Sequence, residues 1–129
     1  MPKKKQAKSN SQTTGVKPEK IGVLIYCPSD LMLTGILKAF EPDKSIEILA
    51  VEKGTIESLM EAIKQLQSQV ILFAHLEPLP HLKEICKAIK ELIKPQIKTQ
   101  LLLLGNIPSQ EEIINLINAG ARGYFDLND

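Results

Sequence analysis

The sequence contains no tryptophan, and only 4% of its 129 residues are aromatic. It has two cysteines, Cys27 and Cys86, which stand far apart with neither a CxxC spacing nor histidine partners nearby. This pattern suggests neither a disulfide framework nor a zinc site, and it favours reduced thiols. No apolar run approaches the roughly 20 residues that cross a bilayer, and the N-terminus lacks the apolar segment of a secretory signal. We therefore expect a soluble, cytoplasmic protein without a membrane partner.

Common site motifs are missing as well. The residues that follow the first apolar run, 26–30 (YCPSD), include no glycine, so they cannot form a GxGxxG or GxxxxGK[ST] loop around a phosphate. The two histidines, His75 and His81, have no nearby serine in a GxSxG elbow. These absences exclude the usual nucleotide-binding and hydrolase sites. His81 fits best as an exposed residue at the start of a helix.

Charge is distributed unevenly along the chain. Residues 1–20 carry six lysines and one glutamate, whereas the remaining 109 residues hold 10 basic and 14 acidic side chains. After the initiating methionine, this segment has one alanine and one valine, too little apolar surface to offset the entropy lost on ordering. We expect residues 1–20 to form a disordered basic tail. Its lysines also allow weak contacts with nucleic acid or acidic proteins.

From residue 21 onward, short apolar runs alternate with amphipathic segments. The apolar runs have strand length and predict strands at 21–26, 46–51, 70–74, 101–104 and from residue 123. Apolar residues at spacings of three and four predict helices at 30–40, 55–67, 81–93 and from 109 to 119. Ser29 or Asp30 caps the first helix, Pro95 ends the third, and Ser109 opens the fourth in a capping box.

Five strands that alternate with helices predict one α/β domain over residues 21–129. The expected architecture is a doubly wound, parallel five-stranded sheet with helices on both faces. In such sheets ligands bind beyond the carboxyl ends of the strands, where the strand order reverses. Candidate functional residues therefore lie at 26–30, 74–80, 105–108 and 125–128.

The string Ala119 to Tyr124 (AGARGY) and the spacing of the elements resemble the receiver domain of response regulators. Among receivers, this chain resembles most the NarL/FixJ type, which is attached to LuxR-type helix-turn-helix regulators. The features in register with that pattern are Val23 to Tyr26, Gly35, Val70 to Phe73, Pro78 and Leu101 to Leu104. The resemblance covers residues 21–127 and implies a CheY/flavodoxin-like fold.

The receiver reaction needs an acidic pair after the first strand to hold Mg²⁺, and an aspartate after the third strand to accept the phosphoryl group. It also needs a Ser or Thr after the fourth strand and a Lys after the fifth. The resemblance assigns these positions, in the same order, to Cys27 and Pro28, Ala74, Gly105 and Leu127. None of these side chains can do that chemistry.

Two nearby carboxylates cannot replace the acidic residues that are missing from this degenerate pocket. Asp30 lies one helical turn further on, and Glu77 stands too far along its loop to replace the acceptor. We therefore expect no phosphotransfer, no Mg²⁺ or other metal site, no cofactor and no enzymatic activity.

The last strand carries a candidate interaction face, Tyr124 and Arg122. Tyr124 stands at the position of the aromatic switch residue of receivers, with ordinary core packing as the alternative for this ring. A receiver continues into a fifth helix, which is missing before the chain ends at Asp129. We expect a protein partner, a second copy or the N-terminal segment to cover the apolar surface left open, unless the chain is a fragment of a longer regulator.

The favoured interpretation is a phosphorylation-independent pseudo-receiver, a protein-interaction module in two-component signalling or transcription regulation. One alternative is a small-ligand or redox sensor that reuses the vacated pocket with Cys27 and His75 at its rim. The helix N-terminus after Cys27 would lower the pKa of its thiol, although a buried structural thiol is the simpler interpretation. A second alternative is a nucleic-acid accessory role of the lysine tail, which predicts steeply salt-dependent binding.

Overall fold

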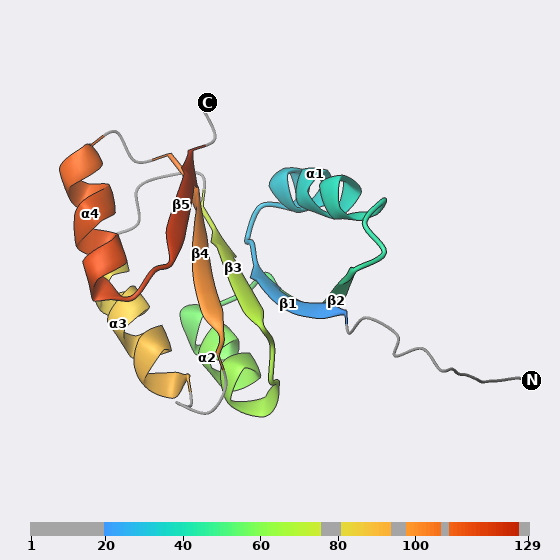
Figure 1. The fold of residues 1–129 in the computed structure, drawn as a ribbon, viewed down its shortest axis with the longest axis horizontal. Helices are drawn as coiled ribbons and strands as arrows, with labels where there is room; N and C mark the ends of the chain where they lie inside the picture. Colours follow the sequence, from blue (N-terminus) through green and yellow to red (C-terminus); the bar gives the residue numbers. More distant parts are fainter. Residues whose placement is uncertain (1–19, 76–80, 94–97, 107–108, 127–129) are drawn as a thin grey trace, which may run out of the picture.

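The computed structural model describes residues 20–75, 81–93, 98–106 and 109–126. The predicted tail, apart from Lys20, lies outside the described residues, as do Pro78, Pro95 and Leu127. The strands are β1 (Ile21–Tyr26), β2 (Ile46–Glu52), β3 (Val70–Ala74), β4 (Gln100–Gly105) and β5 (Gly123–Asp126). The helices are α1 (Asp30–Phe40), α2 (Ile56–Gln65), α3 (Leu82–Leu92) and α4 (Gln110–Ala119) (Figure 1).

The five strands form one parallel sheet in the order β2-β1-β3-β4-β5. Strand order reverses at β1, because the chain first adds β2 on one side and then β3, β4 and β5 on the other. Every connection crosses over through a helix, as parallel pairing requires. The predicted doubly wound α/β fold is confirmed, and its topological switch point lies between β1 and β3.

Local sequence signals set the helix ends. Ser29, Thr55 and Ser109 cap α1, α2 and α4, and each side-chain oxygen accepts a hydrogen bond from a backbone N–H of the first turn. α4 ends at Gly120, whose φ of 134° suits a residue without Cβ. The helix predicted at 55–67 stops two residues earlier than expected, at Gln65, because Leu66 already adopts an extended conformation that leads into β3.

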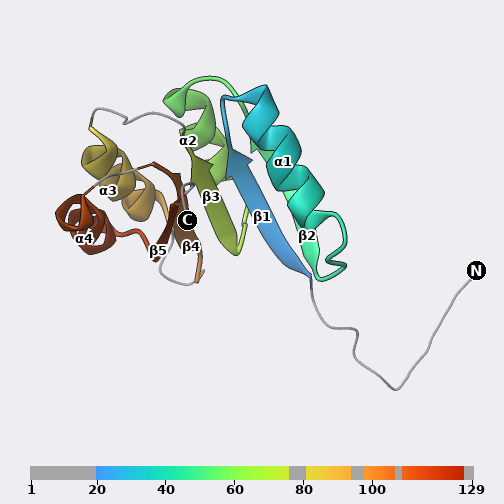
Figure 2. The same cartoon turned by 90° about the horizontal axis from the view of Figure 1, so that it is seen from above.

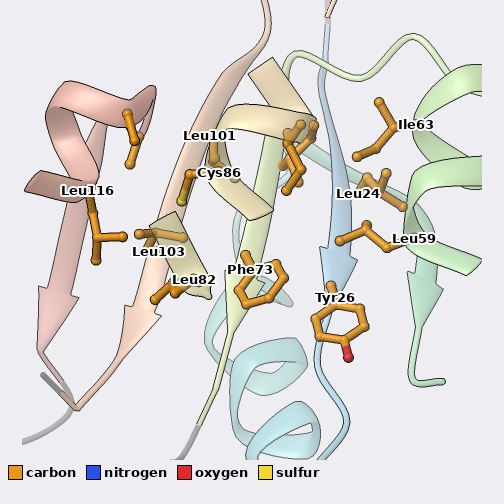
Figure 3. Close-up of a cluster of buried hydrophobic side chains, with 14 residues drawn as sticks. Leu24, Tyr26, Leu59, Ile63, Phe73, Leu82, Cys86, Leu101, Leu103 and Leu116 are labelled. Carbon is orange, nitrogen blue, oxygen red and sulfur yellow. The ribbon is translucent and has the colours of Figure 1, made fainter. Parts of the chain in front are cut away.

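The core has two parts, one on each face of the sheet. The larger part packs the sheet against α2, α3 and α4, and its labelled side chains in Figure 3 are Leu24, Tyr26, Leu59, Ile63, Phe73, Leu82, Cys86, Leu101, Leu103 and Leu116. The smaller part packs it against α1 and contains Val23, Ile25, Cys27, Leu33, Ile36, Leu72 and Ala74. Side chains alternate between the faces along each strand, so neighbouring residues belong to different parts.

The face that carries α1 is only partly covered. Of the described helices, α1 alone lies on this face, while α2, α3 and α4 cover the opposite one (Figure 2). Leu102 and Leu104 of β4 remain half-buried, and Phe125 of β5 is 55% exposed. Within the described ranges no fifth helix follows β5, and no helix has the length and apolar character needed to cross a bilayer.

Candidate functional site

The carboxyl ends of β1, β3, β4 and β5 meet at one edge of the sheet. The register pairs Tyr26 with Phe73, Ala74 with Leu104, and Gly105 with Asp126. This edge is where receivers hold their reacting groups, and the structure brings Cys27, Ala74 and Gly105 to it as the sequence predicts. Pro28 directly follows Cys27 and is exposed, and Leu127, the fifth predicted position, lies outside the described residues.

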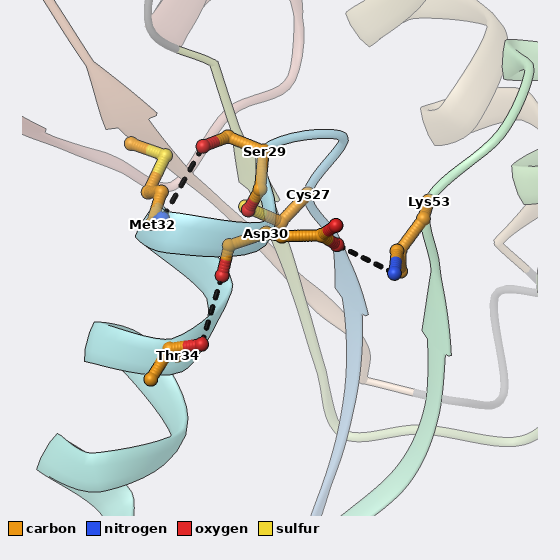
Figure 4. A network of polar contacts seen from close by, with 6 residues as sticks. All are labelled: Cys27, Ser29, Asp30, Met32, Thr34 and Lys53. Carbon is orange, nitrogen blue, oxygen red and sulfur yellow. Dashed lines mark hydrogen bonds and ion pairs between the residues drawn. The ribbon is translucent and has the colours of Figure 1, made fainter.

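Cys27 is a buried structural thiol. Its backbone N–H donates to the carbonyl of Glu52 at 3.0 Å, and its Sγ lies 3.4 Å from the carbonyl oxygen of Ser29 (Figure 4). The side chain is fully buried beside Ala74 in the smaller core cluster. Burial raises the pKa of the Cys27 thiol, and the nearby Asp30 carboxylate raises it further. The expected lowering by the helix N-terminus is therefore outweighed by desolvation.

Asp30, the first residue of α1 after the end of β1, forms an ion pair with a lysine. Its Oδ1 lies 2.5 Å from Nζ of Lys53, which follows β2, and both side chains are largely exposed (Figure 4). Pro28, the other residue at an acidic-pair position, is exposed and offers no oxygen ligand from its side chain. In the described part of the chain, no three His, Cys, Asp or Glu side chains gather in a way that would hold a metal ion.

The histidine after β3 occupies the space at the end of β4. A Cβ atom added to Gly105 would lie 2.5 Å from both Cε1 and Nε2 of His75. His75 is 4% exposed, and its backbone N–H donates to the carbonyl of Leu104 at 2.9 Å. The position that the resemblance assigns to the Ser or Thr of receivers therefore holds no side chain, and an imidazole ring lies over it.

His75 belongs to a row of rings that crosses the sheet on the face of α2, α3 and α4. Tyr26 stacks on Phe73 with ring centroids 4.7 Å apart, Phe73 lies 6.2 Å from His75, and His75 meets Tyr124 edge-on at 6.3 Å. Sequence reasoning did not identify this row. The signal for it was a His directly after Ala74 together with a Gly at the end of β4.

Cys27 and His75 do not share a pocket. The thiol packs in the cluster under α1, whereas the imidazole contacts Phe73 and Tyr124, which belong with the cluster under the other three helices. The sheet separates the two side chains. Among the described residues, Cys27 and His75 therefore do not form the common rim expected for a small-ligand or redox sensor.

The predicted interaction face divides between the interior and the surface. Tyr124 points inward and packs against the larger core cluster, whereas Arg122 is exposed. The exposed apolar side chains on the neighbouring elements are Phe125 of β5 at 55%, and Ile114 and Ile117 of α4 at 57% and 44%. β5 is the last described strand in the sheet order.

A separate pocket of about 290 Å³ lies at the opposite edge, near the amino ends of β3 and β4. Ile63, Leu66, Ser68, Leu92 and Thr99 contribute to its wall. It is remote from the carboxyl edge and takes no part in the candidate site.

Comparison with known proteins identifies the architecture. No protein-family model and no curated protein matches the sequence. Among solved structures, the signal receiver domain of the response regulator NarL from Mycobacterium tuberculosis is 19% identical, with 87% of each chain covered and a TM-score of 0.72. The receiver domain of RcsB from Salmonella enterica serovar Typhimurium is 14% identical, with 86% of this chain and 80% of that chain covered and a TM-score of 0.72.

The chain has the receiver-domain fold. The pilus assembly protein CpaE from Caulobacter crescentus CB15 shares it as well, at 15% identity and a TM-score of 0.68, with 86% of this chain and 85% of that chain covered. At these identities the likeness concerns the fold alone, and the chemistry must be argued from the residues at the carboxyl edge.

Proposed function

We propose that this chain is a phosphorylation-independent pseudo-receiver, a protein-interaction module that acts in two-component signalling or transcription regulation in the cytoplasm. The observation that carries the proposal is the chemistry of the carboxyl edge. Cys27 and Ala74 are buried and apolar in character, and Gly105 lies beneath an imidazole ring. Phosphoryl transfer needs a carboxylate acceptor and a metal held by oxygen ligands, and these positions supply neither.

The ion pair between Asp30 and Lys53 supports the same proposal. Asp30, a carboxylate in the first turn after β1, is paired with Lys53. Since Mg²⁺ requires several hard oxygen ligands in near-octahedral geometry, one lysine-paired carboxylate makes a poor site. We infer that the domain is not an enzyme and uses no cofactor.

The proposed interaction surface lies on α4 and β5. Ile114 and Ile117 expose apolar area on α4. Arg122, directly before β5, exposes a charged side chain, and Phe125 of β5 exposes an aromatic ring. Aromatic and Arg side chains are enriched in protein interfaces, and an edge strand with exposed apolar neighbours is a site for association. A protein partner or a second copy of the chain would bind there.

The test compares the purified chain with and without beryllofluoride and Mg²⁺, by thermal unfolding and light scattering. A ligand present at 100 times its Kd adds about 2.7 kcal/mol to the free energy of unfolding. We expect no change in unfolding temperature or mass, while an active receiver included as a control responds. Stabilisation by beryllofluoride would show that the pocket still binds a phosphoryl analogue, and the proposal would fail.

Association is tested on the chain itself. Sedimentation velocity over a range of concentrations should show self-association that Ile117→Glu weakens and that acetyl phosphate leaves unchanged. Thr34→Glu, at an exposed position on α1, is the control. If acetyl phosphate changes the association, the surface is under phosphorylation control and the proposal is wrong.

A further inference from the structure

Gly105 has no side chain, and the imidazole ring of His75 fills the space that a side chain at position 105 would occupy. A Cβ at position 105 would lie 2.5 Å from two atoms of the imidazole ring and 2.9 Å from a third, Cδ2. The backbone of Gly105 has no positive φ, so a side chain there is opposed by lack of space and not by backbone strain. Any residue larger than glycine must displace His75.

His75 is held over that space from several directions. Its backbone N–H bonds to Leu104, which continues the β3–β4 pairing one residue beyond Ala74 and fixes the start of the side chain above β4. Phe73 and Tyr124 flank the ring at 6.2 and 6.3 Å, and the side chain is 4% exposed. In a close-packed interior, movement of this ring would require its neighbours to move as well.

We infer that the His75 side chain acts as a plug: it fills the space above Gly105 and thereby holds Tyr124 and the β4–β5 edge in one conformation. Tyr124 pairs with Leu103, so the space above Gly105 is the adjoining volume on the same face into which its ring would move. A conformational switch needs two discrete arrangements of a packed element, and the imidazole occupies the volume that a second arrangement of Tyr124 would require. The domain therefore presents one constant α4–β5 surface.

This inference deepens the proposed function, because it gives a physical reason for constant activity, but its test does not involve phosphorylation. The first test is a double-mutant cycle on the folding equilibrium constant. Gly105→Ser in the native background overpacks the site and lowers the constant about 5- to 150-fold. In the His75→Ala background the same change should lower the constant by a clearly smaller factor, since the serine then enters vacated space.

The matched control is Gly35→Ser, at an α1 position where an added Cβ meets nothing within 4 Å. Its effect should be the same with His75 and with alanine at position 75, because independent sites act additively. If the effects of Gly105→Ser and His75→Ala multiply independently, the pairing is absent and the inference is overturned. Gly105→Ala serves in the same cycle if the serine variant does not fold.

The second test reads the state of Tyr124 directly. Its ring signals in an NMR spectrum should report one conformation in the native chain and exchange between two in His75→Ala. Exchange already present in the native chain, or an unchanged ring in the variant, would overturn the plug. A native chain that shows the coupling but is stabilised by beryllofluoride would overturn the proposed function and leave the plug intact.

Discussion

Gln69 forms two hydrogen bonds with Gly22 at the start of β1, one through its side chain and one through its backbone. Its Oε1 accepts a hydrogen bond from the backbone N–H of Gly22 at 2.7 Å, and its own backbone N–H donates to the carbonyl of Gly22 at 2.9 Å. These two bonds lie directly before the first paired residues of β1 and β3, Val23 and Val70. They are in register with the pairing of β1 and β3, which places Tyr26 beside Phe73 at the far end of the strands.

Removing the side-chain hydrogen bond of Gln69 should lower the free energy of unfolding. Gln69→Leu leaves the N–H of the buried Gly22 without its acceptor, and we expect a loss of about 1–2 kcal/mol in the free energy of unfolding. Urea denaturation measures the loss. Gln67→Leu, at an exposed neighbouring position, is the control and should change stability by less than about 0.5 kcal/mol. Equal effects of the two variants would contradict a specific role of Gln69.

The two phenylalanines at the carboxyl edge should behave in opposite ways. Phe73 is fully buried in the row of rings, so Phe73→Ala should lower the free energy of unfolding by about 3–5 kcal/mol. Phe125 is 55% exposed, so Phe125→Ala should change it by less than about 0.5 kcal/mol and should instead weaken association through β5. Urea denaturation and sedimentation separate these effects. A stable Phe73→Ala variant would contradict the ring row.

Two glycines in different backbone conformations should respond in opposite ways to replacement by alanine. Gly120 has φ 134°, and a Cβ there would also lie 2.9 Å from Cδ of Lys90, so Gly120→Ala should destabilise the domain by about 1–2 kcal/mol. Gly35 stands in the middle of α1 with open space around it, so Gly35→Ala should stabilise the domain by about 0.5–1 kcal/mol. Thermal unfolding of both variants is the measurement, and the same sign for both would refute this assignment.

Stability should fall at alkaline pH through Cys86. Burial raises the pKa of this thiol from 9.0 to about 11. The unfolded chain therefore loses the proton at lower pH than the folded chain. The contribution of Cys86 is fully present below pH 9 and is lost as the pH rises through about 11.

The measurement is the free energy of unfolding between pH 8 and 11 in the native chain and in Cys86→Ala, at roughly one-unit intervals chosen to bracket the thiol's titration. The native chain should lose more stability over this range than the variant. Lysines titrate in both proteins and cancel in the comparison. Parallel curves would show that Cys86 is not held protonated by the fold.

Much of the architecture followed from local patterns. The apolar runs predicted β1 and β3 to the residue, and the caps of α1 and α4 were predicted as Ser29 or Asp30 and as Ser109. Thr55 was placed inside the second helix, whereas the structure shows it as the cap of α2. The end of α2 was misplaced by two residues, because Leu66 satisfies the helical spacing but turns toward β3 to reach the sheet. Periodicity shows which residues are apolar. The residue at which a helix ends depends also on where the following strand lies in the fold.

The site was predicted in part. Cys27, Ala74 and Gly105 were placed at one edge because parallel strands share their carboxyl ends. The role of His75 could not be read in the same way, since its partner Gly105 is 30 residues away and the two meet only through the pairing of β3 with β4. The inward direction of Tyr124 and the exposure of Phe125 likewise depend on which face of β5 meets the larger core cluster.

The sequence by itself determined the order and type of the elements and the parallel sheet they form, because these follow from local periodicity, and residue identity determined which side chains stand at the ends of the strands. Only the tertiary structure decided that Cys27 and His75 lie on opposite sides of the sheet, that Lys53 pairs with Asp30, and that an imidazole fills the space over Gly105. Those relationships join residues distant in the chain, and they exist only once strand register and side-chain packing have fixed which surfaces meet.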